Sequence, residues 1–160
     1  MSEILGALFK NLASLLGVAA AALILYAVFG SSKTGNAIND LNQLQTNTQT
    51  LYSTQSTFTS LTNAVAIGGQ LAPTRMISAG NLVNPWSGAI TVNVNAGDAT
   101  RFDVTEAGVP NDPCSKMATN TPSIVGLKIN GTAQTLPIDA GAAVNACNAS
   151  PNTMIFTFSH

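Results

Sequence analysis

The chain has 160 residues, which is the size of one domain or of one domain with a tail. Only 8% of the residues are charged and the formal net charge is −1, so the clustered Lys and Arg that phosphate contacts need are missing and nucleic acid is not expected as the main ligand. The 46% of apolar residues also excludes an acidic disordered chain.

The first 30 residues are predicted to form an apolar helix. Residues 12–29 carry no charge, and as a helix they would rise about 27 Å, close to the thickness of the hydrocarbon core of a bilayer. Three interpretations are open: a cleaved secretory signal, a permanent single-span anchor, and a helix that waits in the membrane and later packs against copies of itself. Small residues such as Gly6, Ala7 and Gly17 let helix backbones approach closely and favour the third, although they are common in any spanning helix.

Two charges interrupt this apolar helix, at Glu3 and Lys10. A carboxylate at the apolar end of a membrane helix is costly unless it is paired. The partners available to Glu3 are the α-amino group of a neighbouring copy and the helix N-terminus, where negative charge is favourable. The simpler alternative is a Glu at the start of a helix that lies at the membrane interface.

Residues 31–60 are predicted to continue the helix as the amphipathic half of a long spine. Ile38, Leu41, Leu44, the weakly apolar Thr48 and Leu51 follow one another at spacings of three or four, which indicates one helical face, and Tyr52 and Leu61 are the next apolar residues considered with them. We expect this helix to end at about residue 53 or residue 60. Three glycines are candidate positions for a loosened or bent helix: Gly17, Gly30 and Gly35.

Residues 61–160 are predicted to form a globular domain with an antiparallel sheet. All seven prolines lie in this part, and alternating apolar and polar residues predict strands at 89–95, 100–105, 124–130 and 154–158. Asn130-Gly131 predicts a hairpin turn, with residues 132–136 as the return strand. A short helix is expected in 139–147, with Asp139 near its start, and a short helix or a loop in 64–85. The fold class is therefore α+β, with a long N-terminal helix packed on a C-terminal antiparallel sheet.

The two cysteines are Cys114 and Cys147. A membrane segment followed by an exported domain implies an oxidising compartment, so a disulfide between them is expected, and two free buried thiols in a cytosolic protein are the alternative. A redox or zinc site is not expected, because the chain has no Cys-x-x-Cys and no internal His. Four carboxylates could hold calcium but lack the spacing of a dedicated loop: Asp98, Asp103, Glu106 and Asp112.

Nothing in the sequence indicates an enzyme. A Ser or Cys nucleophile needs a base such as His or Lys and an orienting acid, and the single histidine is the last residue, His160. There is no nucleophile elbow and no phosphate-binding loop. We therefore expect no catalytic residue, no cofactor and no metal.

Several short motifs occur in a characteristic order. They are Ser31–Ile38 at the exit of the apolar helix, Leu51-Tyr52 near the end of the spine, Leu82-Val-Asn-Pro-Trp-Ser-Gly88 before a strand, and Asp112–Met117 around the first cysteine. With an apolar N-terminal helix, a second cysteine and an aromatic last strand, they make the chain similar to the type IV pilins. Within them it resembles the type IVb class, which includes bundle-forming pilin, toxin-coregulated pilin and the pilins of conjugative thin pili.

The resemblance implies a major structural subunit of an extracellular pilus, drawn from an inner-membrane pool by the pilus assembly machinery. The subunit would polymerise with its own copies through the apolar helix, for adhesion to a host or recipient-cell surface, aggregation, conjugation or motility. The residues expected in helix contacts are Met1, Glu3, Leu5, Leu8, Phe9, Leu12, Leu15, Leu16, Leu23, Leu25 and Phe29.

The chain also differs from the usual pattern of these pilins. The glutamate that they usually carry at the fifth mature position is at Glu3 here, and the fifth residue is Leu5. Lys10 within the apolar run is unusual as well, whereas Met1 is compatible with type IVb pilins that begin with an N-methylated Met. Two alternatives of similar architecture are a minor pilin or tip adhesin, and a pseudopilin of a type II secretion system.

Overall fold

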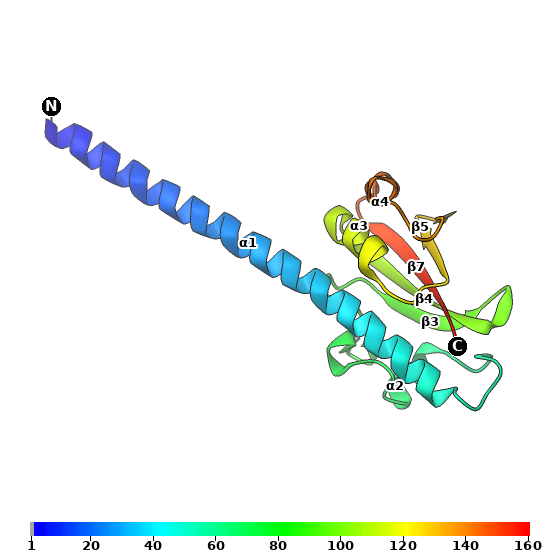
Figure 1. Cartoon of the computed structure of the whole chain (residues 1–160). Helices are drawn as coiled ribbons and strands as arrows, with labels where there is room; N and C mark the ends of the chain where they lie inside the picture. The colour runs from blue at the N-terminus through cyan, green and yellow to red at the C-terminus, as the bar shows by residue number, and fades with distance from the viewer. Residues whose placement is uncertain (1) are drawn as a thin grey trace. The chain divides into compact units, whose positions relative to one another are not determined.

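The computed structural model describes residues 2–160, with side chains described for residues 2–11 and 30–160. The chain divides into two compact units, Met1–Lys33 and Thr34–His160, and each is described by itself. The first unit consists of the N-terminal part of one helix. The second contains the sheet and the remaining helices (Figure 1).

Helix α1 spans Ser2–Leu51 without a break, and so runs through Gly17, Gly30 and Gly35. The expected long helix is therefore present, and its backbone stays helical at these glycines. The helix ends earlier than the expected 53 or 60. After Leu51 the chain turns, with the backbone N–H of Gln55 donating to the carbonyl of Tyr52 at 2.9 Å, and the polar run that follows has no apolar face to keep a helix on the core.

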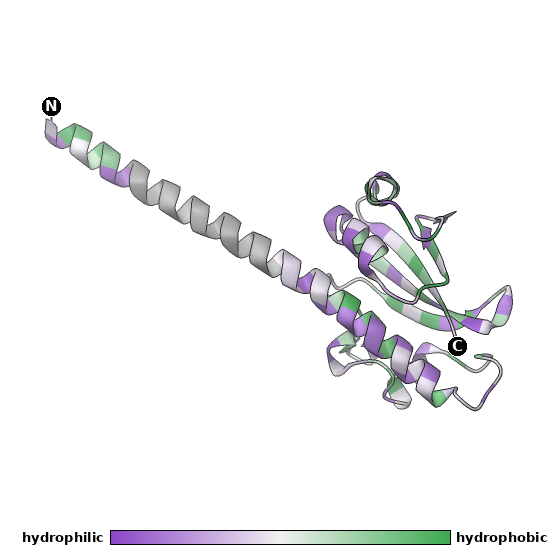
Figure 2. Ribbon diagram, in the orientation of Figure 1, coloured by the Kyte–Doolittle hydropathy of each residue, from purple (hydrophilic) through white to green (hydrophobic). Residues whose placement is uncertain are grey.

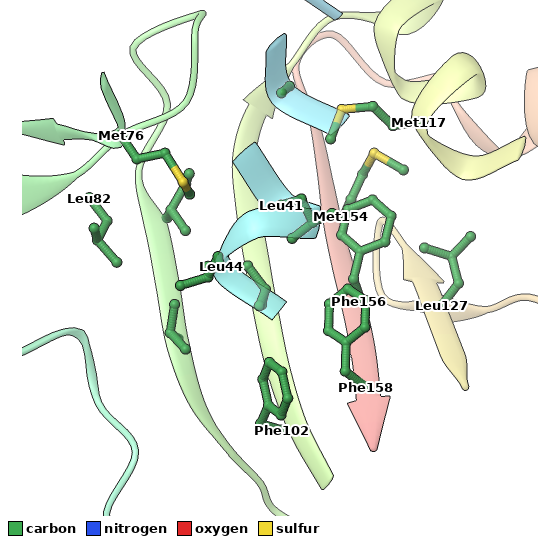
Figure 3. Close-up of a cluster of buried hydrophobic side chains, with 14 of the residues drawn as sticks. Leu41, Leu44, Met76, Leu82, Phe102, Met117, Leu127, Met154, Phe156 and Phe158 are labelled. Carbon is green, nitrogen blue, oxygen red and sulfur yellow. The ribbon is translucent and has the colours of Figure 1, made fainter. Parts of the chain in front are cut away.

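The second half of α1 packs on the sheet through one face. Leu41 and Leu44 are fully buried, and Figure 3 shows them beside Phe102, Phe156 and Met154 of the sheet. Two expectations about this face are corrected. Leu51 is 48% exposed because it is the last residue of the helix, and Leu61 reaches the core from the loop that follows rather than from the helix.

The main sheet has five antiparallel strands in the order β3-β4-β7-β5-β6. Strand β7, the last in the chain, lies between β4 and β5 (Figure 1). The expected strands are present, but β4 is longer than predicted and β6 is much shorter than the predicted return strand. The bounds are Ile90–Asn95 for β3, Asp98–Val109 for β4, Gly126–Ile129 for β5, Thr132–Ala133 for β6 and Asn152–Ser159 for β7.

The segment between α1 and the sheet holds short elements, as the sequence allowed. They are α2 (Asn63–Gly68), a 3₁₀ helix η1 (Thr74–Met76) and the two-residue strands β1 (Ile77–Ser78) and β2 (Asn81–Leu82). The side chain of Asn63 donates to the carbonyl of Ile90 at 2.9 Å and accepts from the N–H of Val92 at 2.6 Å. It thereby occupies part of the open edge of β3, which would otherwise present unpaired backbone groups.

The C-terminal half of the domain contains two further helices, which a disulfide joins. Helix α3 (Asn111–Asn120) was not predicted, whereas α4 (Ala140–Ala146) was, and Asp139 caps α4 by accepting from the N–H groups of Gly141 and Ala142. The expected disulfide is confirmed: Cys114 in α3 is bonded to Cys147 at the end of α4.

Candidate assembly surface

Four large apolar side chains are exposed at the start of α1. The exposed fractions are 67% for Ile4, 55% for Leu5, 55% for Leu8 and 70% for Phe9. At 100° per residue the four lie within an arc of about 140° on one side of the helix, and we call this side the apolar face. Figure 2 shows hydrophobic colour at this end of α1. A grouped apolar surface of this kind marks a site of contact with a protein or a membrane.

The opposite side of the same helix is polar or small, and we call it the charged face. It carries Glu3, Gly6, Ala7 and Lys10, all of them exposed. A Cβ atom built on Gly6 would meet no other atom within 4 Å, so this face is open at Gly6. The structure thus places Glu3 on a different side of the helix from Leu5, Leu8 and Phe9.

The other residues expected in helix contacts lie outside the part of the chain whose side chains are described: Met1, Leu12, Leu15, Leu16, Leu23, Leu25 and Phe29. The same holds for the expected membrane segment, residues 12–29. Within the described residues, no helix has both the length and the apolar character that crossing a membrane requires.

A buried polar cluster, which the sequence analysis missed, lies where α1 meets the rest of the globular domain. The carboxylate of Asp40 on α1 is buried and accepts a hydrogen bond from the Arg75 guanidinium of η1. Burial raises the pKa of Asp40, and the neighbouring Arg75 opposes that rise. A charged group buried in this way needs a partner, and Arg75 supplies it.

Glu106 is the second carboxylate of this cluster and is almost entirely buried. Its pKa is raised to about 8, chiefly by burial, with a smaller contribution from the negative charge of Asp40. The Asn84 side chain donates to Glu106 at 3.5 Å and opposes the rise. The alternation of β4 could have identified Glu106 as buried, since Phe102 and Val104 precede it at intervals of two and face the core.

Asn84 also holds the turn of the Leu82–Gly88 motif. Its Nδ2 donates to the carbonyl of Ala107 at 2.7 Å, and its Oδ1 accepts from the N–H groups of Trp86 at 3.2 Å and Gly88 at 2.8 Å. A Cβ atom on Gly88 would collide with the backbone carbonyl of Ala107. The motif therefore has a packing role, because it holds the start of β3 against β4. It has no chemically reactive group of its own.

The four carboxylates considered for calcium are not brought together. Asp98 pairs with Arg101 at 3.1 Å, Asp112 pairs with Lys116 at 2.8 Å, and Asp103 accepts from Asn95 and Thr157. The fourth is the buried Glu106. Within residues 2–160, as far as side chains are described, no group of three metal-ligating residues is close enough to hold an ion.

One open hollow lies beside α1 in the globular unit, with a volume of about 700 Å³. Its walls come from α1, the end of α2 and η1, and they combine amide, hydroxyl and guanidinium groups with short apolar side chains. The lining residues that can hydrogen-bond to a ligand are Gln43, Gln70, Thr74 and Arg75.

Known proteins share this arrangement of helix and sheet. The family model described as Bundlin matches residues 30–155. The type IVb pilin from Salmonella typhi has a TM-score of 0.64 at 23% identity, over 79% of this chain and 99% of that chain. TcpA, a type IV pilin from Vibrio cholerae El Tor biotype, has a TM-score of 0.56 at 16% identity, over 80% and 99%. No curated protein matches the chain.

The solved structures show the fold of the chain, and the family model shows the family to which it belongs. At these identities the two solved structures establish the fold, which is that of type IVb pilins and agrees with the α+β class expected from the sequence. The family match covers most of the chain, from residue 30, at the end of the apolar part of α1, to the middle of β7. The chain belongs to the Bundlin family.

Proposed function

We propose that this protein is a major structural subunit of a type IVb pilus, which polymerises through the N-terminal part of α1. The observation that carries the proposal is the apolar face, with its four exposed large side chains in a chain of the Bundlin family. A subunit that remained alone in water would expose this face at a cost of about 25 cal/mol for each Å² of apolar surface. Packing against the same helix of other copies removes that cost.

The proposed mechanism is the transfer of α1 from lipid to a bundle of identical helices. Little net transfer energy is involved, because lipid tails and packed apolar side chains are similar environments, and close packing then drives association. Within such a bundle Glu3 needs a cation from a neighbouring subunit, since an unpaired carboxylate in an apolar core is costly. The α-amino group of an adjacent copy is one candidate.

The proposal places the protein in an extracellular filament, with unassembled subunits held in the inner membrane for the pilus assembly machinery. The filament would serve adhesion to a host or recipient cell, aggregation, conjugation or motility. It requires no enzymatic activity and no cofactor.

Phe9→Asn tests whether the apolar face drives assembly. We expect filaments to be lost, because the variant buries an unsatisfied amide in the helix bundle, whereas Phe9→Leu, the matched control, keeps an apolar side chain and assembles. Negative-stain microscopy of sheared filaments, with immunoblots of the membrane fraction, gives the readout. Wild-type amounts of filament from Phe9→Asn would rule out this face as the driving contact.

A minor pilin or tip adhesin is the alternative that an observation favours. The hollow lined by Gln43, Gln70, Thr74 and Arg75 offers several hydrogen-bond donors, which suits a glycan or a surface of another pilus. Copy number separates the two functions, because a major pilin makes up most of the purified filament and an adhesin only a trace. A pseudopilin, which often carries a calcium site, receives no support from the separated carboxylates.

A further inference from the structure

The charged face of α1 carries one negative side chain, Glu3, and one positive side chain, Lys10. Glu3 and Lys10 are seven residues apart, which is 20° short of two full turns, so their side chains leave the helix in nearly the same direction. Along the helix axis they are about 10.5 Å apart. Both are exposed, and no ion pair among the described residues involves either of them.

We propose that Glu3 of one subunit pairs with Lys10 of the next, and that this ion pair sets the axial offset between neighbouring α1 helices. The inference rests on the proposed function and names the contact through which copies recognise each other. The occupant of the charged face is thus a second copy of this chain, lying parallel and shifted along the axis by seven residues, which brings its Glu3 level with Lys10.

The charge pattern selects this arrangement over an unshifted one. In a parallel pair without an offset, Glu3 faces Glu3 and Lys10 faces Lys10, and juxtaposed like charges are strongly unfavourable. With the seven-residue offset, the Glu3 carboxylate of each subunit pairs with one neighbour and its Lys10 ammonium group pairs with another. A contact of this head-to-tail kind does not close on itself, and it repeats into an open helical polymer.

In the proposed filament, the two faces of α1 contact different neighbours. The apolar face, made up of Ile4, Leu5, Leu8 and Phe9, points away from the charged face, so both can be covered at once by different neighbours. Gly6 and Ala7 lie between the two charges, and a Cβ on Gly6 meets nothing within 4 Å in the subunit. Small side chains at these positions let a neighbouring helix approach closely enough for the ion pair to form.

Charge reversal tests the pairing in cells that assemble the pilus. Glu3→Lys and Lys10→Glu each leave two like charges on the face, and each should give at least about tenfold fewer filaments. The double variant Glu3→Lys/Lys10→Glu restores opposite charges at the same spacing and should recover most of the loss. The two single variants are complementary to each other, so they should also form mixed filaments when expressed in one cell.

Two measurements distinguish loss of the ion pair from a failure of the variant to insert into the membrane or to fold. The amount of subunit in the membrane fraction and the oxidation of Cys114 with Cys147 report insertion, export and folding. Wild-type filaments treated with a carbodiimide, which joins a carboxylate directly to an adjacent amine, should yield a dimer whose digest links Glu3 of one subunit to Lys10 of another.

The inference is overturned by either of two results. One is a double variant and a mixed expression that both stay as defective as the single variants, although the subunits are inserted and oxidised. The other is a carbodiimide product that joins Glu3 to the α-amino group, which would make that group its partner. If the wild-type chain formed no filaments at all, the proposed function would fail, and the pairing with it.

Discussion

At the scale of single residues, Glu106 has the strongest effect on how stability depends on pH. Its pKa rises from 4.5 to about 8 on folding. Between these values the folded protein holds a proton that the unfolded chain releases, so the free energy of unfolding is largest at low pH and falls as the pH rises toward 8. The slope is at most about 1.4 kcal/mol per pH unit. The raised pKa of Asp40 acts in the same direction.

Glu106→Gln should remove most of this pH dependence. Gln keeps the size of the side chain and can still bond to Asn84, but it has no proton to lose. Urea unfolding of the detergent-solubilised chain at pH 5 and pH 8 measures the effect: the wild type should be clearly less stable at pH 8, and the variant should change little. Equal pH dependence in the two proteins would show that Glu106 is already ionised in the fold.

Among the residues of the fold, buried polar side chains are the hardest to predict from the sequence. Asn152 is fully buried, and its side chain bonds to Val109, Asn111, Asn130 and Ala149. In a chain rich in Asn and Thr nothing local separates Asn152 from its exposed counterparts, because three of its four partners are 22 to 43 residues away. Glu106 differs, since the alternation of β4 already places it on the core side.

At the scale of elements, the disulfide joins two short helices that are far apart in the sequence. It closes a loop of 33 residues between α3 and α4. Replacing both cysteines by Ala should lower the free energy of unfolding by about 3–4 kcal/mol. A reductant should lower the melting temperature of the wild type to a similar degree and leave the double variant unaffected. A wild type that melts at the same temperature with and without reductant would contradict this.

The packing face of α1 offers a matched pair of variants. Leu44 and Leu51 share the predicted apolar face, but Leu44 is fully buried and Leu51 is 48% exposed. Leu44→Ala should cost about 2–5 kcal/mol, the range for a buried leucine, and Leu51→Ala should cost no more than about 1 kcal/mol. Denaturant midpoints of the two variants provide the measurement. Similar losses would mean that the end of the helix is packed as tightly as its middle.

The elements that sequence analysis predicted correctly are those with a clear period. Alternation identified β3 and the core of β4, β5 and β7, and the three-to-four spacing identified α1. Helix α3 was missed because Pro113 and a largely polar sequence hide its short apolar side, although Pro is tolerated in the first turn of a helix. The end of α1 was placed too late because the residues after Leu51 include no Gly or Pro before Gly68 that would mark the end of a helix.

At the scale of the whole molecule, scarce charge has different roles in the two units. In the first unit, Glu3 and Lys10 lie on the charged face and are available to other copies. In the second, three of the six acidic residues are neutralised by a basic neighbour at Arg75, Arg101 or Lys116. The resulting surface, rich in Asn, Thr and Ser, suits subunits that stack with little repulsion.

The central place of β7 has a consequence for the order of synthesis. The final strand fills the middle of the sheet, and beyond it His160 stacks on Phe58 at 4.3 Å while Gln49 donates to the carbonyl of Ser159 at 2.6 Å. Until the last nine residues have been synthesised, β4 and β5 have no strand between them and the Phe-rich core stays open. The domain therefore has to be shielded from aggregation until synthesis is complete, and a chain that stops early is marked by an exposed core.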